Sequence, residues 1–274
     1  MTTYIVGDIH GAAQTFEDLL SKISYNSKKD ELFLVGDLVN NGPDSAQVVR
    51  LAKELNAKVT LGNHDLHMLA VAFGAAKPRK KDTFQDLLHA QDADALIDWL
   101  RHQHMFLQHD SFWMAHAGIH PSWDLATTLE ISHAIEEALQ SKNPASFFEH
   151  MYGNDPIAWS SNLSREEQLR FGINSMTRMR ALHTPAHTLE FKYKATLDTM
   201  PETLQPWFVP AHNRTQQPSL FFGHWSALGL HTHEPTRTIC LDSGCTWGKQ
   251  LTAYNPHTHT YEQVDTRKGE AASH

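Results

Sequence analysis

The chain has 274 residues, and 23 Lys and Arg residues stand against 31 Asp and Glu residues, which gives a formal net charge of −8. This acidic balance disfavours a broad nucleic-acid-binding surface, because such surfaces carry an excess of positive charge. With 41% hydrophobic residues, the chain can bury a core, and its length fits one large domain or two small ones.

The first third of the chain alternates short apolar runs with segments of helical spacing. The predicted strands are residues 3–7, 31–36 and 57–62, and each of them ends in glycine. The predicted helices that follow them are residues 13–24, 45–55 and 64–74. Three strand–loop–helix units in succession predict a mainly parallel sheet, so the expected fold class is α/β.

Beyond residue 75 the pattern changes. Residues 75–110 begin with a basic loop, KPRKK, and continue with an amphipathic stretch, whereas residues 124–200 are predicted to be mostly helical. We interpret both segments as cap elements. Later strands are predicted at 111–118, 219–225, 236–244 and 250–255. We expect a single domain over residues 1–265 and a loose polar tail at 266–274.

Polar side chains follow the ends of five predicted strands. They are Asp8 and His10 in GDIHG, Asp37 in GDLV, Asn63 and His64 in GNHD, His116 in HAG, and His224 in GHW. Sites in α/β folds form in the loops beyond the carboxyl ends of strands, so these side chains are expected to meet at one edge of the fold. Any one of these motifs alone is more often a simple turn, but five of them in this order are not expected by chance.

The residue types in this cluster point to divalent metal ions. Carboxylate, imidazole and amide oxygen suit manganese, iron or cobalt. A shared carboxylate can hold two metals roughly 3.5–4 Å apart with a hydroxide between them. The sequence therefore predicts a two-metal site.

The order GD-x-H-G, GD-x-V, GNH[DE], H-[AG]-G and GH resembles the phosphoprotein-phosphatase branch of the metallophosphoesterases. The segments GNHDLHMLAVAFG, MAHAGIHPSWD, TRMR, LQPWF, FFGHW and LDSGCTWG are more closely similar to the bacterial symmetrical diadenosine tetraphosphatases. The resemblance runs from residue 3 to about residue 255. It implies a calcineurin-like metallophosphoesterase β-sandwich flanked by helices, with a mainly helical cap.

The resemblance also implies a role for each residue of the cluster. Asp8 and His10 hold the first metal, Asp37 bridges both metals, and Asn63, His116 and His224 complete the second site. The bridging hydroxide is the nucleophile, and His64 is the general acid. The implied cofactors are two divalent metal ions, with manganese or cobalt favoured and iron, nickel or zinc as alternatives.

Three further residues are candidates for binding the substrate phosphates. Arg178 and Arg180 lie in TRMR, which resembles the arginine segment of the family, and the arginine fork suits phosphate. Asn41 is the third. In the protein phosphatases of this branch the GD-x-V block continues with Asp and Arg, and the tetraphosphatases keep only the Arg. This chain has Asn40 and Asn41 there, so Asn41 departs from both patterns and removes one charged contact.

The implied activity is cleavage of diadenosine tetraphosphate at its centre to give two ADP. Removal of caps derived from dinucleoside tetraphosphates from RNA 5′ ends is a related activity. Two alternatives stay open: a protein Ser/Thr phosphatase with the same metals, and a non-catalytic dinucleotide sensor, which only Asn41 supports. No obligate protein partner is expected.

The cytoplasm is the expected location. The strand pattern starts at residue 3, which leaves no room for a signal peptide. No apolar run approaches the roughly 20 residues that span a membrane. The two cysteines, Cys240 and Cys245, do not form a disulfide framework.

Overall fold

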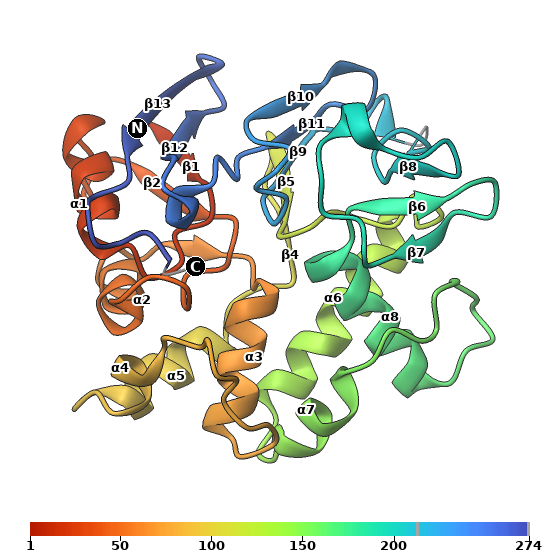
Figure 1. The fold of residues 1–274 in the computed structure, drawn as a ribbon, viewed down its shortest axis with the longest axis horizontal. Coiled ribbons are helices and arrows are strands. Elements are labelled where there is room, and N and C mark those ends of the chain that lie inside the picture. The colour runs from red at the N-terminus through yellow and green to blue at the C-terminus, as the bar shows by residue number, and fades with distance from the viewer. Residues whose placement is uncertain (212–213, 273–274) are drawn as a thin grey trace.

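The computed structural model describes residues 1–211 and 214–272, and it places two five-stranded sheets in the upper half of the view in Figure 1. The first sheet has the order β13-β12-β1-β2-β3. Its strands are β1 (Thr3–Val6), β2 (Glu31–Leu34), β3 (Lys58–Val59), β12 (Gln250–Asn255) and β13 (Thr260–Asp265). β1, β2 and β3 are parallel, as predicted, whereas β12 is antiparallel to both β1 and β13.

The second sheet has the order β10-β11-β9-β5-β4. Its strands are β4 (Phe106–Gln108), β5 (Phe112–Ala115), β9 (Ser219–Phe222), β10 (His231–His233) and β11 (Thr238–Cys240). The three central strands, β5, β9 and β11, are parallel to one another. The carboxyl ends of β5 and β9 therefore lie at the same edge of this sheet.

An apolar core joins the two sheets face to face. Phe33 of β2 contacts Phe112 of β5 with 4.9 Å between ring centroids, and Tyr254 of β12 contacts Phe221 of β9 at 5.1 Å. All four rings belong to one buried cluster with Ile5 of β1. Burying five side chains of this size contributes roughly 1.5–3 kcal/mol each. The predicted β-sandwich is confirmed.

Helices lie beside the first sheet and continue below it (Figure 1). They are α1 (Ala13–Lys22), α2 (Ser45–Glu54), α3 (Asn63–Ala72), α4 (Gln85–Leu88) and α5 (Ala93–Arg101). The 3.6-residue spacing of Phe16 and Leu19 buries one face of α1. Because β1, β2 and β3 are parallel, the loops that follow these three strands all begin at the same edge of the first sheet.

The cap consists of helices followed by a small sheet. The helices are α6 (Leu125–Gln140), α7 (Ala145–Met151) and α8 (Arg165–Arg178). Ser164 and Glu167 form a capping box that fixes the start of α8. The prediction of a mostly helical segment up to residue 200 is wrong beyond Arg178. There, β6 (Ala181–His183) pairs with β7 (Thr188–Glu190) and β8 (Leu204–Pro206), because the turn-forming HTPAH segment allows a hairpin.

The segment predicted to be a loose tail is anchored in its described part. Glu270 is 3% exposed. Its carboxylate accepts hydrogen bonds from the backbone N–H groups of Gln14 and Thr15 and from the hydroxyl of Thr15. A carboxylate at the first turn of a helix is favourable, because the free N–H groups there carry a partial positive charge. Within the described residues, no helix is long and apolar enough to cross a membrane.

Candidate active site

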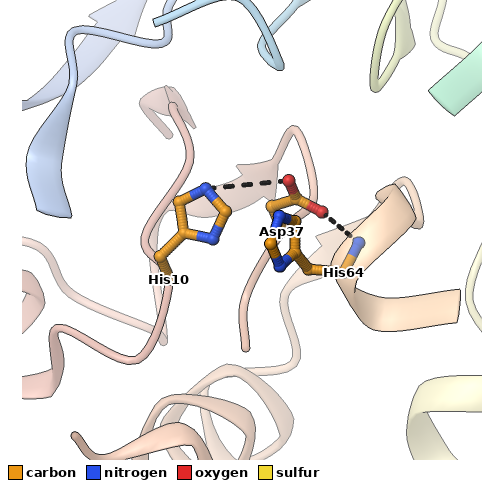
Figure 2. Close-up of side chains that lie close together, drawn as sticks. All are labelled: His10, Asp37 and His64. Carbon is orange, nitrogen blue, oxygen red and sulfur yellow. Dashed lines mark hydrogen bonds and ion pairs between the residues drawn. The ribbon is translucent and has the colours of Figure 1, made fainter. Parts of the chain in front are cut away.

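The loops after the strands of both sheets bring the predicted metal ligands together. Asp8 and His10 follow β1, Asp37 follows β2, Asn63 begins α3, His116 follows β5, and His224 follows β9. Asp37 lies at the centre, with its Oδ2 3.7 Å from His10 Nε2 and 3.3 Å from His116 Nε2. Its Oδ1 accepts a hydrogen bond of 2.9 Å from the backbone N–H of His64. Figure 2 shows the contacts that His10 and His64 make with this carboxylate.

Asp8, His224 and Asn63 close the cluster across the two sheets. The backbone N–H of His224 donates to Oδ2 of Asp8 at 2.9 Å. In the amide orientation that satisfies its neighbours, the side-chain nitrogen of Asn63 lies 2.9 Å from His224 Nδ1. His224, which follows β9, is thus held through its backbone by Asp8, which follows β1, and through its ring by Asn63, which follows β3.

The cluster contains more buried negative charge than its own side chains compensate. Burial and the nearby Asp242 raise the pKa of Asp8 well above its usual range. Burial also acts to raise the pKa of Asp37, but His116 and His64 outweigh it and hold that pKa well below its usual range. Burial acts to lower the pKa of His116, and attraction to Asp37 outweighs it and brings the pKa to about 10. The surroundings of Asp37 therefore favour positive charge.

The donor set fits a pair of divalent metal ions. Among the described residues, Asp8 Oδ1 and His224 Nε2 are buried without a hydrogen-bond partner, which costs free energy unless something binds them. Two groups of possible ligands have their donor atoms within 4.8 Å of one another: His10, Asp37 and His64, and Asp37, His116 and His224. Asp37 belongs to both groups, as a bridging ligand must.

The backbone around this cluster adopts the left-handed region that non-glycine residues rarely occupy. The φ angles are 53° at His10, 48° at Asp37, 74° at Asn40, 66° at Asn41 and 66° at His224. Asparagine tolerates this conformation better than most residues. Backbone strain of this kind concentrates at functional sites, because the surrounding structure must hold it in place.

Two glycines are required by the close approach of the carboxylates. A Cβ atom at Gly62 would overlap Oδ1 and the backbone nitrogen of Asp37, and a Cβ atom at Gly223 would overlap Oδ1 of Asp8. The glycines of GNHD and GHW therefore leave room for the two acidic side chains.

Metal binding should stabilise the folded protein, because ligands from both sheets surround one site. An excess of Mn²⁺ or Co²⁺ at about a thousand times its Kd is expected to add about 4 kcal/mol to the free energy of unfolding. Thermal unfolding followed by circular dichroism, with and without the metal and after chelation, measures this effect. A His224→Ala variant should show a smaller gain. Equal unfolding temperatures with and without metal would contradict the metal site.

A cavity of about 700 Å³ opens directly onto the cluster. Its lining includes four cationic side chains: Arg79, Arg178, Arg180 and Lys194. It also includes four aromatic side chains: Tyr152, Phe191, Trp225 and Trp247. Cations together with aromatic faces suit a ligand that carries several phosphates and has flat rings at its ends.

Comparisons with known proteins agree with this geometry. The calcineurin-like phosphoesterase family matches residues 1–178. Proteins named symmetrical bis(5'-nucleosyl)-tetraphosphatase match nearly the whole chain. The one from Janthinobacterium sp. strain Marseille is 41% identical, and the match covers 96% of each chain. The one from Nitrosospira multiformis is 40% identical, over 100% of this chain and 99% of its own.

The chain belongs to the symmetrical bis(5'-nucleosyl)-tetraphosphatase family of calcineurin-like phosphoesterases. A crystal structure described provisionally as a diadenosine tetraphosphatase is 25% identical, with a TM-score of 0.67. The match covers 97% of this chain and 94% of that one. The predicted family and fold are thus confirmed, and so is the assignment as a hydrolase.

The two arginines predicted to bind phosphate both line the cavity of this tetraphosphatase-family protein, but they differ in their contacts. Arg180 donates from Nη2 to the backbone carbonyl of His224 at 3.0 Å. Arg178 lies over the ring of Phe191 and donates to the carbonyl of Gly153 and to the side chain of Asn154. Arg180 therefore contacts the Asp37-centred cluster through His224, whereas Arg178 contacts the cap.

Asn41 also lines the cavity, and its amide nitrogen lies 3.3 Å from Nδ1 of His10. Nδ1 of His10 also lies 3.3 Å from the backbone carbonyl of Val39, which can accept its hydrogen and fix the orientation of the ring. Asn41 is thus placed at the cavity, where its amide can donate to a substrate phosphate.

Aromatic side chains of the sequence that could stack on adenine are Trp123, Tyr152, Trp159 and Trp225. Of these, Tyr152 and Trp225 line the cavity. Trp123 and Trp159 pack instead on Phe171 in the cap. Phe191 and Trp247 also line the cavity. Phe191 lies in no quoted motif, and Trp247 lies in LDSGCTWG but was not singled out as a substrate contact.

Proposed function

We propose that this chain hydrolyses dinucleoside tetraphosphates, with diadenosine tetraphosphate as the reference substrate, at the centre of the phosphate chain. The observation that carries the proposal is the Asp37-centred cluster at the floor of a cavity lined by four cations and four aromatic rings. Water adds at one central phosphorus, the bond from that phosphorus to the bridging oxygen breaks, and each half leaves as ADP.

The roles of the residues follow the predicted assignment. Asp8, His10, Asp37, Asn63, His116 and His224 are the proposed metal ligands. Manganese or cobalt is the preferred pair, since imidazole and carboxylate suit both ions. Bound metals would lower the pKa of a coordinated water and neutralise the charge of the phosphoryl group. The protein's own contribution is to hold the ligands in place and to orient the substrate phosphates.

His64 is the proposed donor to the leaving oxygen. Burial lowers the pKa of His64 to about 4, so the ring is neutral near pH 7 and donates a hydrogen bond. That is sufficient for ADP as a leaving group, because a phosphate with a pKa near 6 needs little protonation. The four cations and four aromatic rings that line the cavity favour the dinucleotide over a protein Ser/Thr phosphatase substrate.

The proposal includes two finer points. An RNA 5′ end that carries a cap derived from a dinucleoside tetraphosphate presents the same phosphate chain to the site, although the net charge of −8 disfavours long RNA. The cytoplasm, where such nucleotides would be met, is the proposed location.

Product analysis tests the reaction. Purified protein with Mn²⁺ or Co²⁺ is incubated with diadenosine tetraphosphate in H₂¹⁸O. The products are separated by chromatography, and their masses are measured by mass spectrometry. We expect only ADP, with one ¹⁸O atom in half of the molecules. ATP with AMP, or no turnover with any divalent metal, overturns the proposal. Tight binding without product indicates the sensor, and faster turnover of a phosphopeptide indicates the protein phosphatase.

Arg180 should be the more important of the two arginines for catalysis. Arg180 lines the cavity and its guanidinium donates to the carbonyl of His224, so Arg180→Ala removes a positive charge beside the proposed position of the reacting phosphates. We expect kcat/KM to fall by about 10²- to 10³-fold. Arg165→Ala is the matched control, because Arg165 pairs with Glu130 and Gln168 and is not part of the cavity lining. Equal, small effects of both changes would exclude the phosphate role of Arg180.

A further inference from the structure

The carboxylate of Asp82, which follows the basic loop, is buried next to the site. Its side chain is 5% exposed. Oδ1 accepts a hydrogen bond of 2.9 Å from the amide nitrogen of Asn40. Oδ2 lies 3.0 Å from Nε2 of His67 and accepts from the backbone N–H of Arg79. Both oxygens are therefore engaged, one of them with a residue that contacts His64.

Asn40 connects Asp82 to the ring of His64. Its oxygen accepts from the backbone N–H groups of Thr83 at 2.9 Å and of Asn41 at 3.0 Å. These two donors, together with the carboxylate of Asp82 that accepts from the nitrogen, fix which end of the amide is oxygen. The amide nitrogen must then face both Asp82 and Nδ1 of His64, which lies 3.0 Å away.

This arrangement determines the tautomer of His64. An amide nitrogen only donates hydrogen bonds, so Nδ1 of His64 must accept one. The ring hydrogen then lies on Nε2. His64 lines the cavity, and the Nε2–H group is the one available to a leaving oxygen.

Asp82 also links the site to the cap. Because Nε2 of His67 donates to Asp82, Nδ1 of His67 is the acceptor for the hydroxyl of Tyr152, 2.8 Å away. Tyr152 follows α7 and lines the substrate cavity. The carboxylate of Asp82 thus binds Asn40, which contacts His64. It also binds His67, which contacts Tyr152 of the cap.

We propose that Asp82 is a positioning residue that acts through Asn40 to fix the ring orientation and the Nε2–H tautomer of His64. Asp82 does not touch the substrate. The proposal rests on the proposed function, since it assigns Asp82 to the hydrogen-bond donor of that reaction. A charged partner strengthens the donation by Asn40, because hydrogen bonds to ionised groups are the stronger ones.

Steady-state kinetics of the metal-loaded enzyme on diadenosine tetraphosphate test the role of Asp82. We expect Asp82→Ala to lower kcat by about 10- to 100-fold, with KM changed by less than about 3-fold. Asp82→Asn, whose oxygen can still accept from Asn40, should keep more activity than Asp82→Ala. Asp92→Asn is the matched control, because Asp92 pairs with Arg50 away from the cavity. Circular dichroism and metal analysis verify that the variants fold and bind metal.

A double-mutant cycle separates positioning from general destabilisation. In a His64→Gln background, Asp82→Ala should change kcat by less than about 2-fold, since the residue it acts on is gone. A full loss that persists in this background overturns the proposal, and so does an unchanged kcat in the Asp82→Ala single variant.

The tautomer can also be observed without catalysis. In the Zn²⁺-loaded protein, ¹⁵N shifts of the histidine rings distinguish the two nitrogens, and His64→Gln identifies the signals of His64. We expect an Nε2–H ring in the wild type and loss of that signature in Asp82→Ala. An identical spectrum in both proteins overturns the link. This measurement stays informative if the wild type forms no ADP, a result that sinks the proposed function alone.

Discussion

Replacing Asp37 by Asn should abolish turnover, because Asp37 is the one carboxylate that both groups of possible metal ligands share. Asparagine has the same size, and its oxygen can still accept from the backbone of His64. The fold should therefore persist while the bridging charge is lost. We expect kcat to fall by at least about 10³-fold, with metal content well below that of the wild type.

Activity assays, metal analysis and thermal unfolding of the same preparation measure these effects. Asp86→Asn is the control for removing a partly buried carboxylate. Asp86 accepts from the backbone N–H of Ala46, outside the cavity, so its replacement should leave kcat within a few-fold. An Asp37→Asn enzyme with substantial activity would show that the two metals do not depend on this bridge.

Gly223→Ala should have the second-largest effect, although it adds only one methyl group. That methyl group would overlap Oδ1 of Asp8 and crowd Val35. Asp8 must then move, and the backbone N–H of His224 loses its partner. Displacing a catalytic group by about 1 Å can cost 10²-fold, and we expect a loss of kcat of about 10²-fold or more with weaker metal binding.

Gly229→Ala is the matched control for this glycine. Gly229 has a φ of 70° and no neighbouring atoms near its added Cβ, so alanine there costs about 1–2 kcal/mol of backbone strain without touching the site. Activity assays on both variants, together with their unfolding temperatures, separate strain from displacement of Asp8. If Gly223→Ala retains normal kcat and metal content, Asp8 is not constrained as the structure implies.

The sequence predicted the cluster well because its members follow strands directly. Asp8, Asp37 and His116 each come within a few residues of an apolar run, and parallel strands in a sheet bring such positions to one edge. Their roles as metal ligands stay predictions, although the structure assembles the side chains. The strands β1 and β2 and the helices α1 and α2 were predicted within two residues, because their periodicity is local.

Other features depend on residues that are far apart in the chain. Asn40 and Asp82 are separated by 42 positions. Asp82 directly follows the basic KPRKK loop, and nothing in the neighbouring sequence shows that its carboxylate binds Asn40 instead of facing solvent. The polar composition of residues 266–274 predicted a loose tail. In the structure, however, Glu270 accepts a hydrogen bond from the start of α1, some 255 positions away in the chain. The three-stranded cap sheet was missed since its strands have only three residues each, which is too short for alternation to be recognised.

The order of strands in the first sheet has a consequence for how the protein is made. β12 lies beside β1, and Ile5 is paired with Tyr254. A chain that grows from its N-terminus therefore presents one side of β1 unpaired until nearly the whole sequence has been synthesised. His224, which completes the cluster with Asp8, also appears late. Contacts of such long sequence separation slow folding, so the first sheet and the cluster beside it should be completed only late, once β12 has been synthesised.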